Sequence, residues 1–96
     1  MRTYQLRALL TTMQTGTYAG AAERLHLSDS SAVRKQVRAL EKELQVPLIE
    51  RSDGQIRPTT AANALVPHLL RILASESAIH SMLVERRAMR HAPRAS

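Results

Sequence analysis

The N-terminal half of the chain alternates between stretches with apolar residues at helical spacing and short polar breaks. In the first stretch such residues recur every three to four positions and predict a helix over residues 4–15; they are Leu6, Leu9, Leu10 and Met13. Gly16 follows, where a left-handed residue commonly closes a helix. Thr17 can then cap a short second helix over residues 18–26, whose small residues let two backbones approach closely.

A third predicted helix, over residues 31–44, follows a polar break at residues 28–30 and has two distinct faces. Its apolar stripe is Val33, Val37, Leu40 and Leu44. The opposite, cationic face carries Ser31, Lys35, Arg38 and Lys42, with Arg34 on the flank. Two helices joined by a short turn, the second with a basic face, are what a reader of the DNA major groove needs. An amphipathic core helix with a solvated basic side gives the same pattern, so this helix alone leaves both interpretations open.

Residues 46–58 change character, because β-branched residues there flank an Asp-Gly pair. Such a pair is a strong hairpin signal and predicts a small two-stranded wing, with a plain loop as the alternative. Arg51 and Arg57 stand at the base of this hairpin. We expect Arg51 to pair with Glu50 or with a helix carboxylate, and Arg57 to contact phosphate.

From Thr60 the pattern becomes helical and predicts a long helix over residues 60–88. Its near-heptad stripe, interrupted by Glu76, consists of Leu65, Leu69, Ile72, Ile79 and Leu83. The rest of the chain is too small to cover this stripe, so we expect a second copy to cover it. Pro67 should kink the helix or leave a carbonyl unpaired. Residues 89–96 are predicted to form a polar basic tail, with Pro93 as a stop.

Composition and charge narrow the class of protein. With 96 residues, the chain forms one domain with an appendage, and its net charge of +6 favours a polyanionic partner. Only two aromatic residues occur, Tyr4 and Tyr18, which argues against base stacking on single strands or RNA. Cysteine is absent, the four histidines lack ligand spacing, and no phosphate loop or nucleophile motif occurs. We therefore expect no enzymatic activity, no metal and no cofactor; with no apolar run of about 20 residues, we expect a cytoplasmic protein.

Several motifs in the right order resemble the LysR-type transcription regulators. They are Gln5-Leu6-Arg7, Gly16-Thr17-Tyr18, Ala21-Ala22-Glu23-Arg24-Leu25, Arg38-Ala39-Leu40-Glu41 and Pro47-Leu48-Ile49-Glu50-Arg51. The resemblance covers about residues 4–85. It implies a winged helix-turn-helix, followed by a linker helix and, in the family, by an effector-binding domain. This chain lacks that last domain, and is either a fragment of a longer regulator or a naturally short one.

The departures from the family pattern fall where DNA would be read. The family usually has Ser-Gln at the start of the recognition helix, whereas here Ser28 is followed by Asp29 and Ser30, and the turn is one residue longer. The glutamine that in the family commonly reaches a base is thus missing, and an acid lies beside the phosphates. Gln45 stands where the family has a glycine, and a left-handed conformation there would cost about 1 kcal/mol relative to Gly.

We therefore predict a mainly α fold: a winged helix-turn-helix domain over residues 1–59, a dimerisation helix over 60–88 and a tail over 89–96. The predicted function is sequence-specific binding of double-stranded DNA as a homodimer or higher oligomer, with the helix over residues 31–44 in the major groove, to regulate transcription. The predicted DNA contacts are Thr17, Ser28, Ser30, Ser31, Arg34, Lys35, Arg38, Gln55 and Arg57. Dimerisation is assigned to Leu65, Leu69, Ile72, Ile79 and Leu83. We expect no membrane partner and no small-molecule site within the chain.

Two alternatives remain open. Asp29 and the missing glutamine also fit an interaction module that has lost DNA binding. Another winged-helix family, such as the molybdate-responsive regulators, would bind duplex DNA as well.

Overall fold

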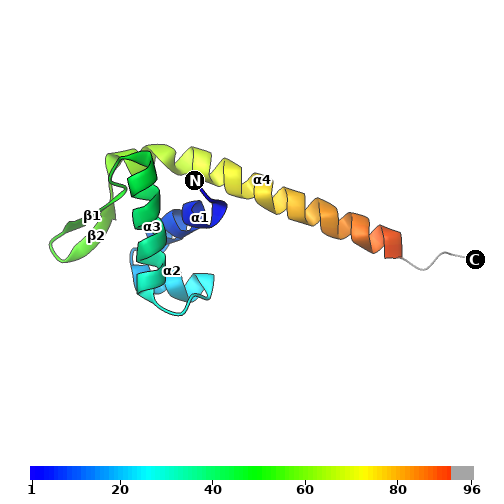
Figure 1. Ribbon diagram of the computed structural model, residues 1–96, viewed down its shortest axis with the longest axis horizontal. Coiled ribbons are helices and arrows are strands. Elements are labelled where there is room, and N and C mark those ends of the chain that lie inside the picture. Colours follow the sequence, from blue (N-terminus) through cyan, green and yellow to red (C-terminus); the bar gives the residue numbers. More distant parts are fainter. Residues whose placement is uncertain (92–96) are drawn as a thin grey trace, which may run out of the picture.

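Three helices form a head, a β-hairpin forms a wing on it, and a long helix projects away (Figure 1). The computed structural model describes the backbone of residues 1–91 and the side chains of residues 1–90. In chain order the elements are α1 (Thr3–Thr15), α2 (Tyr18–Leu25), α3 (Ser30–Leu44), β1 (Ile49–Ser52), β2 (Gln55–Pro58) and α4 (Thr60–His91). This architecture confirms the predicted mainly α, winged helix-turn-helix fold with a long trailing helix.

The core lies where α1, α2 and α3 pack against one another. Its largest fully buried apolar side chains are Leu9, Val33, Val37, Leu40 and Leu48. The predicted stripe of α3 is therefore its core face, apart from Leu44 at the helix end, which is exposed. Ala21 and Ala22 of α2 are also buried, and their small side chains allow the close approach that the sequence predicts.

The ends of α1 and α2 follow the predicted capping pattern. Gly16 closes α1 with a left-handed φ of 82°, and its N–H donates to the carbonyl oxygen of Thr12. The Thr17 hydroxyl accepts the N–H of Gly20 at 2.9 Å and so caps α2. A Cβ on Gly20 would lie 2.9 Å from that same hydroxyl oxygen, so the cap itself requires glycine at this position.

The wing is an antiparallel hairpin in which Arg51 pairs with Ile56 and Glu50 with Arg57. Asp53 and Gly54 form its tip with φ values of 51° and 75°, the two left-handed residues of a type I′ turn. The hairpin prediction is confirmed. The Glu41 carboxylate of α3 accepts the N–H groups of Leu48 and Ile49 at 2.7 and 3.2 Å, and so anchors β1 to the helix.

Thr59 is the single residue between β2 and α4, and it bonds to both sides of the junction. Its N–H donates to the carbonyl oxygen of Leu48 at 2.9 Å, and its hydroxyl donates to that of Pro47 at 2.7 Å. The same hydroxyl accepts the N–H of Ala62 at 3.2 Å, which caps α4. One side chain thus closes the base of the wing and starts the long helix.

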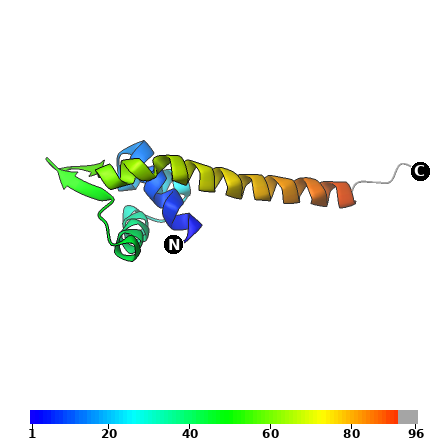
Figure 2. The same cartoon turned by 90° about the horizontal axis from the view of Figure 1, so that it is seen from above.

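The first turns of α4 pack on the head, and the remainder extends beyond it, at the end of the molecule opposite to the wing (Figure 2). Leu69 is only 2% exposed, and Leu65 packs against the same core. For Leu69 this corrects the prediction of a seam left for a second copy, because the head of the same chain already covers it, whereas Leu65 is only partly buried. By contrast, Ile72, Ile79 and Leu83 are exposed.

Pro67 lies inside α4, and the helix continues through it without interruption. The helix runs to His91, three residues past the predicted end at residue 88, so residues 89–91 are helical rather than part of a tail. The rest of the predicted tail, with Pro93, lies outside the described residues. Glu76, which interrupts the apolar stripe, forms an ion pair with Arg7 of α1 and ties α4 to the head.

Candidate nucleic-acid interface

The helix-turn-helix of this chain consists of α2 and α3, joined by residues 26–29. His26 ends α2 in the left-handed conformation, with a φ of 57°. Asp29 then starts α3, because its carboxylate accepts the N–H of Ala32 at 3.1 Å. Ser28, in the connection, is exposed. This turn presents the first residues of α3 to solvent.

Asp29 caps α3, whereas the sequence indicated only that one of the polar residues 28–30 starts a helix or a turn. The Ser31 hydroxyl donates to its carboxylate at 2.5 Å, and this bond, followed by the Ala32 amide bond, holds the pKa of Asp29 below its ordinary value. The acid in the turn therefore remains charged at neutral pH and caps its own helix. Ser31, a predicted DNA contact, uses its hydroxyl within this cap, whereas the neighbouring Ser30 is exposed.

The cationic face of α3 lies opposite the core, as predicted. Lys35 and Arg38 are exposed, while Arg34 is half-buried with its guanidinium 5.3 Å from the centre of the Tyr18 ring. This cation–π contact holds Arg34 against α2 rather than leaving it free in solvent. Positive groups from one helix face and the flanking elements can contact the phosphates of a duplex, which supply most of the affinity in protein–DNA binding.

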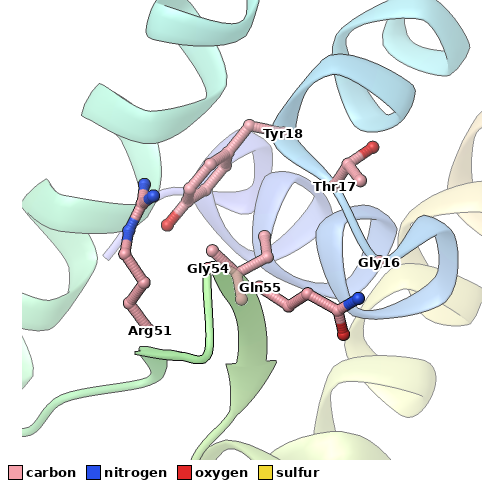
Figure 3. A pocket seen from close by; sticks show the side chains of 7 residues that line it. Gly16, Thr17, Tyr18, Arg51, Gly54 and Gln55 are labelled. Carbon is pink, nitrogen blue, oxygen red and sulfur yellow. The ribbon is translucent and has the colours of Figure 1, made fainter.

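An open groove of about 460 Å³ lies between the wing and the start of α2 (Figure 3). It brings together two of the predicted contacts, Thr17, which caps α2, and Gln55 of β2. Tyr18 and Arg51 also line the groove, and Figure 3 shows the Tyr18 hydroxyl directed toward the Arg51 guanidinium. Arg57 lies exposed opposite Glu50 in the hairpin register.

Arg51 does not form the ion pair that we expected. Among the described side chains, no carboxylate lies within 4.0 Å of its guanidinium, and the ion pairs found there are Met1–Glu43 and Arg7–Glu76. Sequence reasoning also missed Tyr18 as a member of the site. The position of Arg51 could have been predicted from the sequence. In a two-residue hairpin with an Asp-Gly tip, Arg51 must lie across from Ile56, on the face turned to the helices.

The predicted dimer residues that remain exposed lie along one side of α4. Ile72 and Ile79 line a shallow hollow with Arg71, Ser75 and the N-terminal residue of α1, Thr3. Leu83 is 47% exposed further along the helix. Leu69 is buried in the core, and Leu65 is partly buried against it.

Two further findings bear on the class of protein. Within residues 1–91, no helix combines the length and apolar character needed to cross a membrane. In that same part of the chain, no group of three or more histidine, aspartate or glutamate side chains is placed to hold a metal ion.

A compact helix-turn-helix, a hairpin wing and a long helix after the wing define the class as a winged helix-turn-helix regulator domain. The family model described as bacterial regulatory helix-turn-helix protein, lysR family, matches residues 3–63. The chain belongs to this family.

Relatives and solved structures agree with this assignment. The chain is 44% identical over 69 residues to an HTH-type transcriptional regulator of the ibpB-leuC intergenic region of Azotobacter vinelandii, covering 72% of this chain and 47% of that protein. It is 44% identical over 62 residues to the HTH-type transcriptional regulator CbbR of Xanthobacter flavus, covering 65% of this chain and 18% of the regulator. The chain thus spans less than half the length of these relatives.

Two solved structures show the same fold. The CbnR DNA-binding domain, in complex with DNA, superimposes with a TM-score of 0.74 at 36% identity, covering 93% of this chain and 99% of that domain. A full-length OxyR variant from Pseudomonas aeruginosa superimposes with a TM-score of 0.82 at 29% identity, covering 88% of this chain and 28% of OxyR.

Proposed function

We propose that this chain binds double-stranded DNA sequence-specifically, as a dimer, and regulates transcription. The observation that carries the proposal is the face of α3 opposite the core, where Lys35 and Arg38 are exposed on the second helix of a helix-turn-helix. Such a helix enters the major groove, and residues of its first turns reach base edges. The CbnR domain, which has the same fold, was solved as a complex with DNA.

Seven of the nine predicted contacts divide into two groups in this proposal; the other two, Ser31 and Arg34, contact Asp29 and the Tyr18 ring instead. Ser30, Lys35 and Arg38 of α3 face the base edges and the nearest phosphates, because they lie on the exposed side of the recognition helix. The exposed residues around it contact the sugar-phosphate backbone and set the orientation of the head. These are Thr17, Ser28, Gln55 and Arg57.

A salt titration tests the central claim. Binding to random duplex should weaken steeply as salt rises, with a slope of about −0.9 in log K against log salt for each phosphate neutralised. On a duplex selected from a random library, Arg38→Ala or Lys35→Ala should cost about 1–3 kcal/mol at one base position if the side chain reads a base. The matched control is Arg87→Ala, at an exposed arginine far along α4. It should change neither the salt slope nor the affinity for the selected duplex. Unchanged binding by both α3 variants excludes this face as the reading surface.

The proposed dimer uses the exposed stripe Ile72, Ile79 and Leu83, which the head leaves uncovered. Burying one such side chain contributes about 1.5–3 kcal/mol, so two buried together add measurably to association. We expect Ile79→Asp combined with Leu83→Asp to sediment as a monomer at micromolar concentration. The control is Ser81→Asp combined with Ala88→Asp, which adds the same two charges at exposed positions on the opposite side of the helix and should remain dimeric. A dimeric double variant places the interface elsewhere.

The alternative function, an interaction module without DNA binding, was suggested mainly by Asp29. The capping role of this carboxylate gives its presence a structural reason that does not oppose DNA binding. The salt titration separates the two functions, because an interaction module shows no salt-sensitive affinity for duplex. No catalytic reaction is part of the proposal. A DNA-binding regulator of this family would act in the cytoplasm.

A further inference from the structure

A small polar cavity of about 200 Å³ lies between α2, α3 and β1, next to the groove of Figure 3. Its polar lining consists of Tyr18, Arg34, Arg38, Glu41, Glu50 and Arg51. Three guanidinium groups from two different elements therefore meet around one tyrosine. This cluster cannot be recognised in the sequence, because its residues are far apart along the chain. Arg51 reaches α2 and α3 only when the hairpin folds back on the head.

The arginines of this cavity lack carboxylate partners. Among the described side chains, no carboxylate oxygen lies within 4.0 Å of Arg34, Arg38 or Arg51. Glu41 lines the cavity, but one of its oxygens already accepts the amide N–H groups of Leu48 and Ile49. Three guanidinium groups against the two carboxylates of Glu41 and Glu50 leave the lining with one positive charge in excess, and this excess attracts an anion. The cavity thus has the electrostatics of an anion site.

Tyr18 adds a neutral hydrogen-bond donor to these cations. Its ring is fixed by the Arg34 guanidinium, 5.3 Å from the ring centre. Burial, and then the Glu41 carboxylate, raise the pKa of the Tyr18 phenol against the opposing effect of the three arginines, so the hydroxyl keeps its proton at neutral pH. Figure 3 shows the hydroxyl end of Tyr18 directed toward the Arg51 guanidinium. Both can donate to the oxygens of one anion.

We propose that this cavity binds a single phosphate of the DNA backbone, with Arg38 and Arg51 as the charged contacts and the Tyr18 hydroxyl as the neutral donor. Arg34 is a positioning residue, which acts through the Tyr18 ring. The inference rests on the proposed function and deepens it, since it assigns Tyr18 and Arg51 a role beside the recognition helix. Phosphate contacts of this kind fix the register of a protein on the duplex without reading its sequence. The cavity would clamp one strand between α3 and the wing.

Conservative variants separate the two kinds of contact. Tyr18→Phe removes only the hydroxyl and keeps the ring under Arg34. It should weaken duplex binding about tenfold or more, on random and selected sequences alike, with the salt slope unchanged. Arg51→Gln should weaken binding similarly and make the slope shallower by about 0.9, because one cation no longer neutralises a phosphate. The matched controls are Tyr4→Phe, at the other tyrosine of the chain, and Arg87→Gln, both at exposed positions.

Methylphosphonate substitution identifies the phosphate itself. Each phosphate of a selected duplex is neutralised in turn, and the affinities of the wild-type chain and of Tyr18→Phe and Arg51→Gln are compared. We expect one position in each half-site where neutralisation lowers the affinity of the wild type about tenfold but hardly lowers that of either variant. The variants have already lost the contact to that phosphate. Wild-type binding without such a position overturns this inference and leaves the proposed function standing.

Two other outcomes also decide the matter. If the wild type binds no duplex in a salt-sensitive way, the inference fails together with the proposed function. If inorganic phosphate raises the melting temperature of the wild type but not of Tyr18→Phe, and no duplex position couples, the cavity takes a free anion. The assignment to the DNA backbone is then wrong.

Discussion

The Glu41 carboxylate should be the main attachment of the wing to the recognition helix, and its removal should measurably destabilise the chain. Its oxygen accepts two backbone N–H groups, from Leu48 at 2.7 Å and from Ile49 at 3.2 Å, and Leu48 is fully buried. A hydrogen bond to a charged group contributes about 1.5–3 kcal/mol, and a buried donor left unpaired costs about 1–3 kcal/mol. We expect Glu41→Ala to lower the free energy of unfolding by about 2–3 kcal/mol, since water can satisfy part of the loss.

Urea denaturation followed by circular dichroism measures this effect at a fixed protein concentration, because a dimer unfolds in a concentration-dependent way. Glu43→Ala is the control, since Glu43 lies on the same helix and, among the described residues, pairs only with the exposed N-terminal ammonium group at 2.6 Å. An exposed pair of this kind contributes about 0–1 kcal/mol. Glu41→Gln keeps an acceptor oxygen without the charge and should fall between the two. If Glu41→Ala costs no more than Glu43→Ala, the two amide bonds do not hold the wing.

Three further predictions follow from single residues. Gln45→Gly should raise the free energy of unfolding by about 1 kcal/mol, because Gln45 has a left-handed φ of 57°, and Gln45→Ala should give no gain in the same urea titration. Asp29 has a lowered pKa in the folded chain, so its contribution is present above the unfolded value of about 3.9 and lost as pH falls through the folded value. Below about pH 4 the wild type should therefore lose stability relative to Asp29→Asn, whose amide caps at every pH; denaturation curves that run parallel down to about pH 3 would contradict this. Leu69→Ala should cost about 2–5 kcal/mol of folding stability at any protein concentration, whereas Ile79→Ala should act through association, so its effect in calorimetry should disappear on dilution to the monomer, which sedimentation identifies.

The elements with strong local signals were predictable from the sequence. The glycine after α1, the threonine cap of α2 and the Asp-Gly tip of the wing each act within a few residues, so their meaning does not depend on the rest of the fold. The cationic face of α3 was predictable for the same reason, because a helix repeats its faces every few residues.

What the sequence could not show depends on long-range contacts. The apolar stripe of α4 indicates only that something covers it; whether the head or a second chain does so for Leu69 is decided by tertiary packing. Likewise, the Arg34–Tyr18 contact and the meeting of Arg51 with Tyr18 join residues that no local pattern connects. The sequence indicated a helix start at residues 28–30 but not which of the three polar side chains makes the cap, because all three types can do so.

Thr59 makes the junction between wing and long helix too short to act as a hinge. Its amide and hydroxyl are bonded to Leu48, Pro47 and Ala62, so a rotation of α4 carries the base of the wing with it. Arg7 and Glu76 restrain the same helix from the other side of the head. In a dimer held by α4, the distance and the angle between the two recognition helices would therefore be fixed by the geometry of one helix pair. Such a protein should tolerate changes of base sequence between its two half-sites far better than the insertion of a few base pairs, which rotates one half-site away around the duplex.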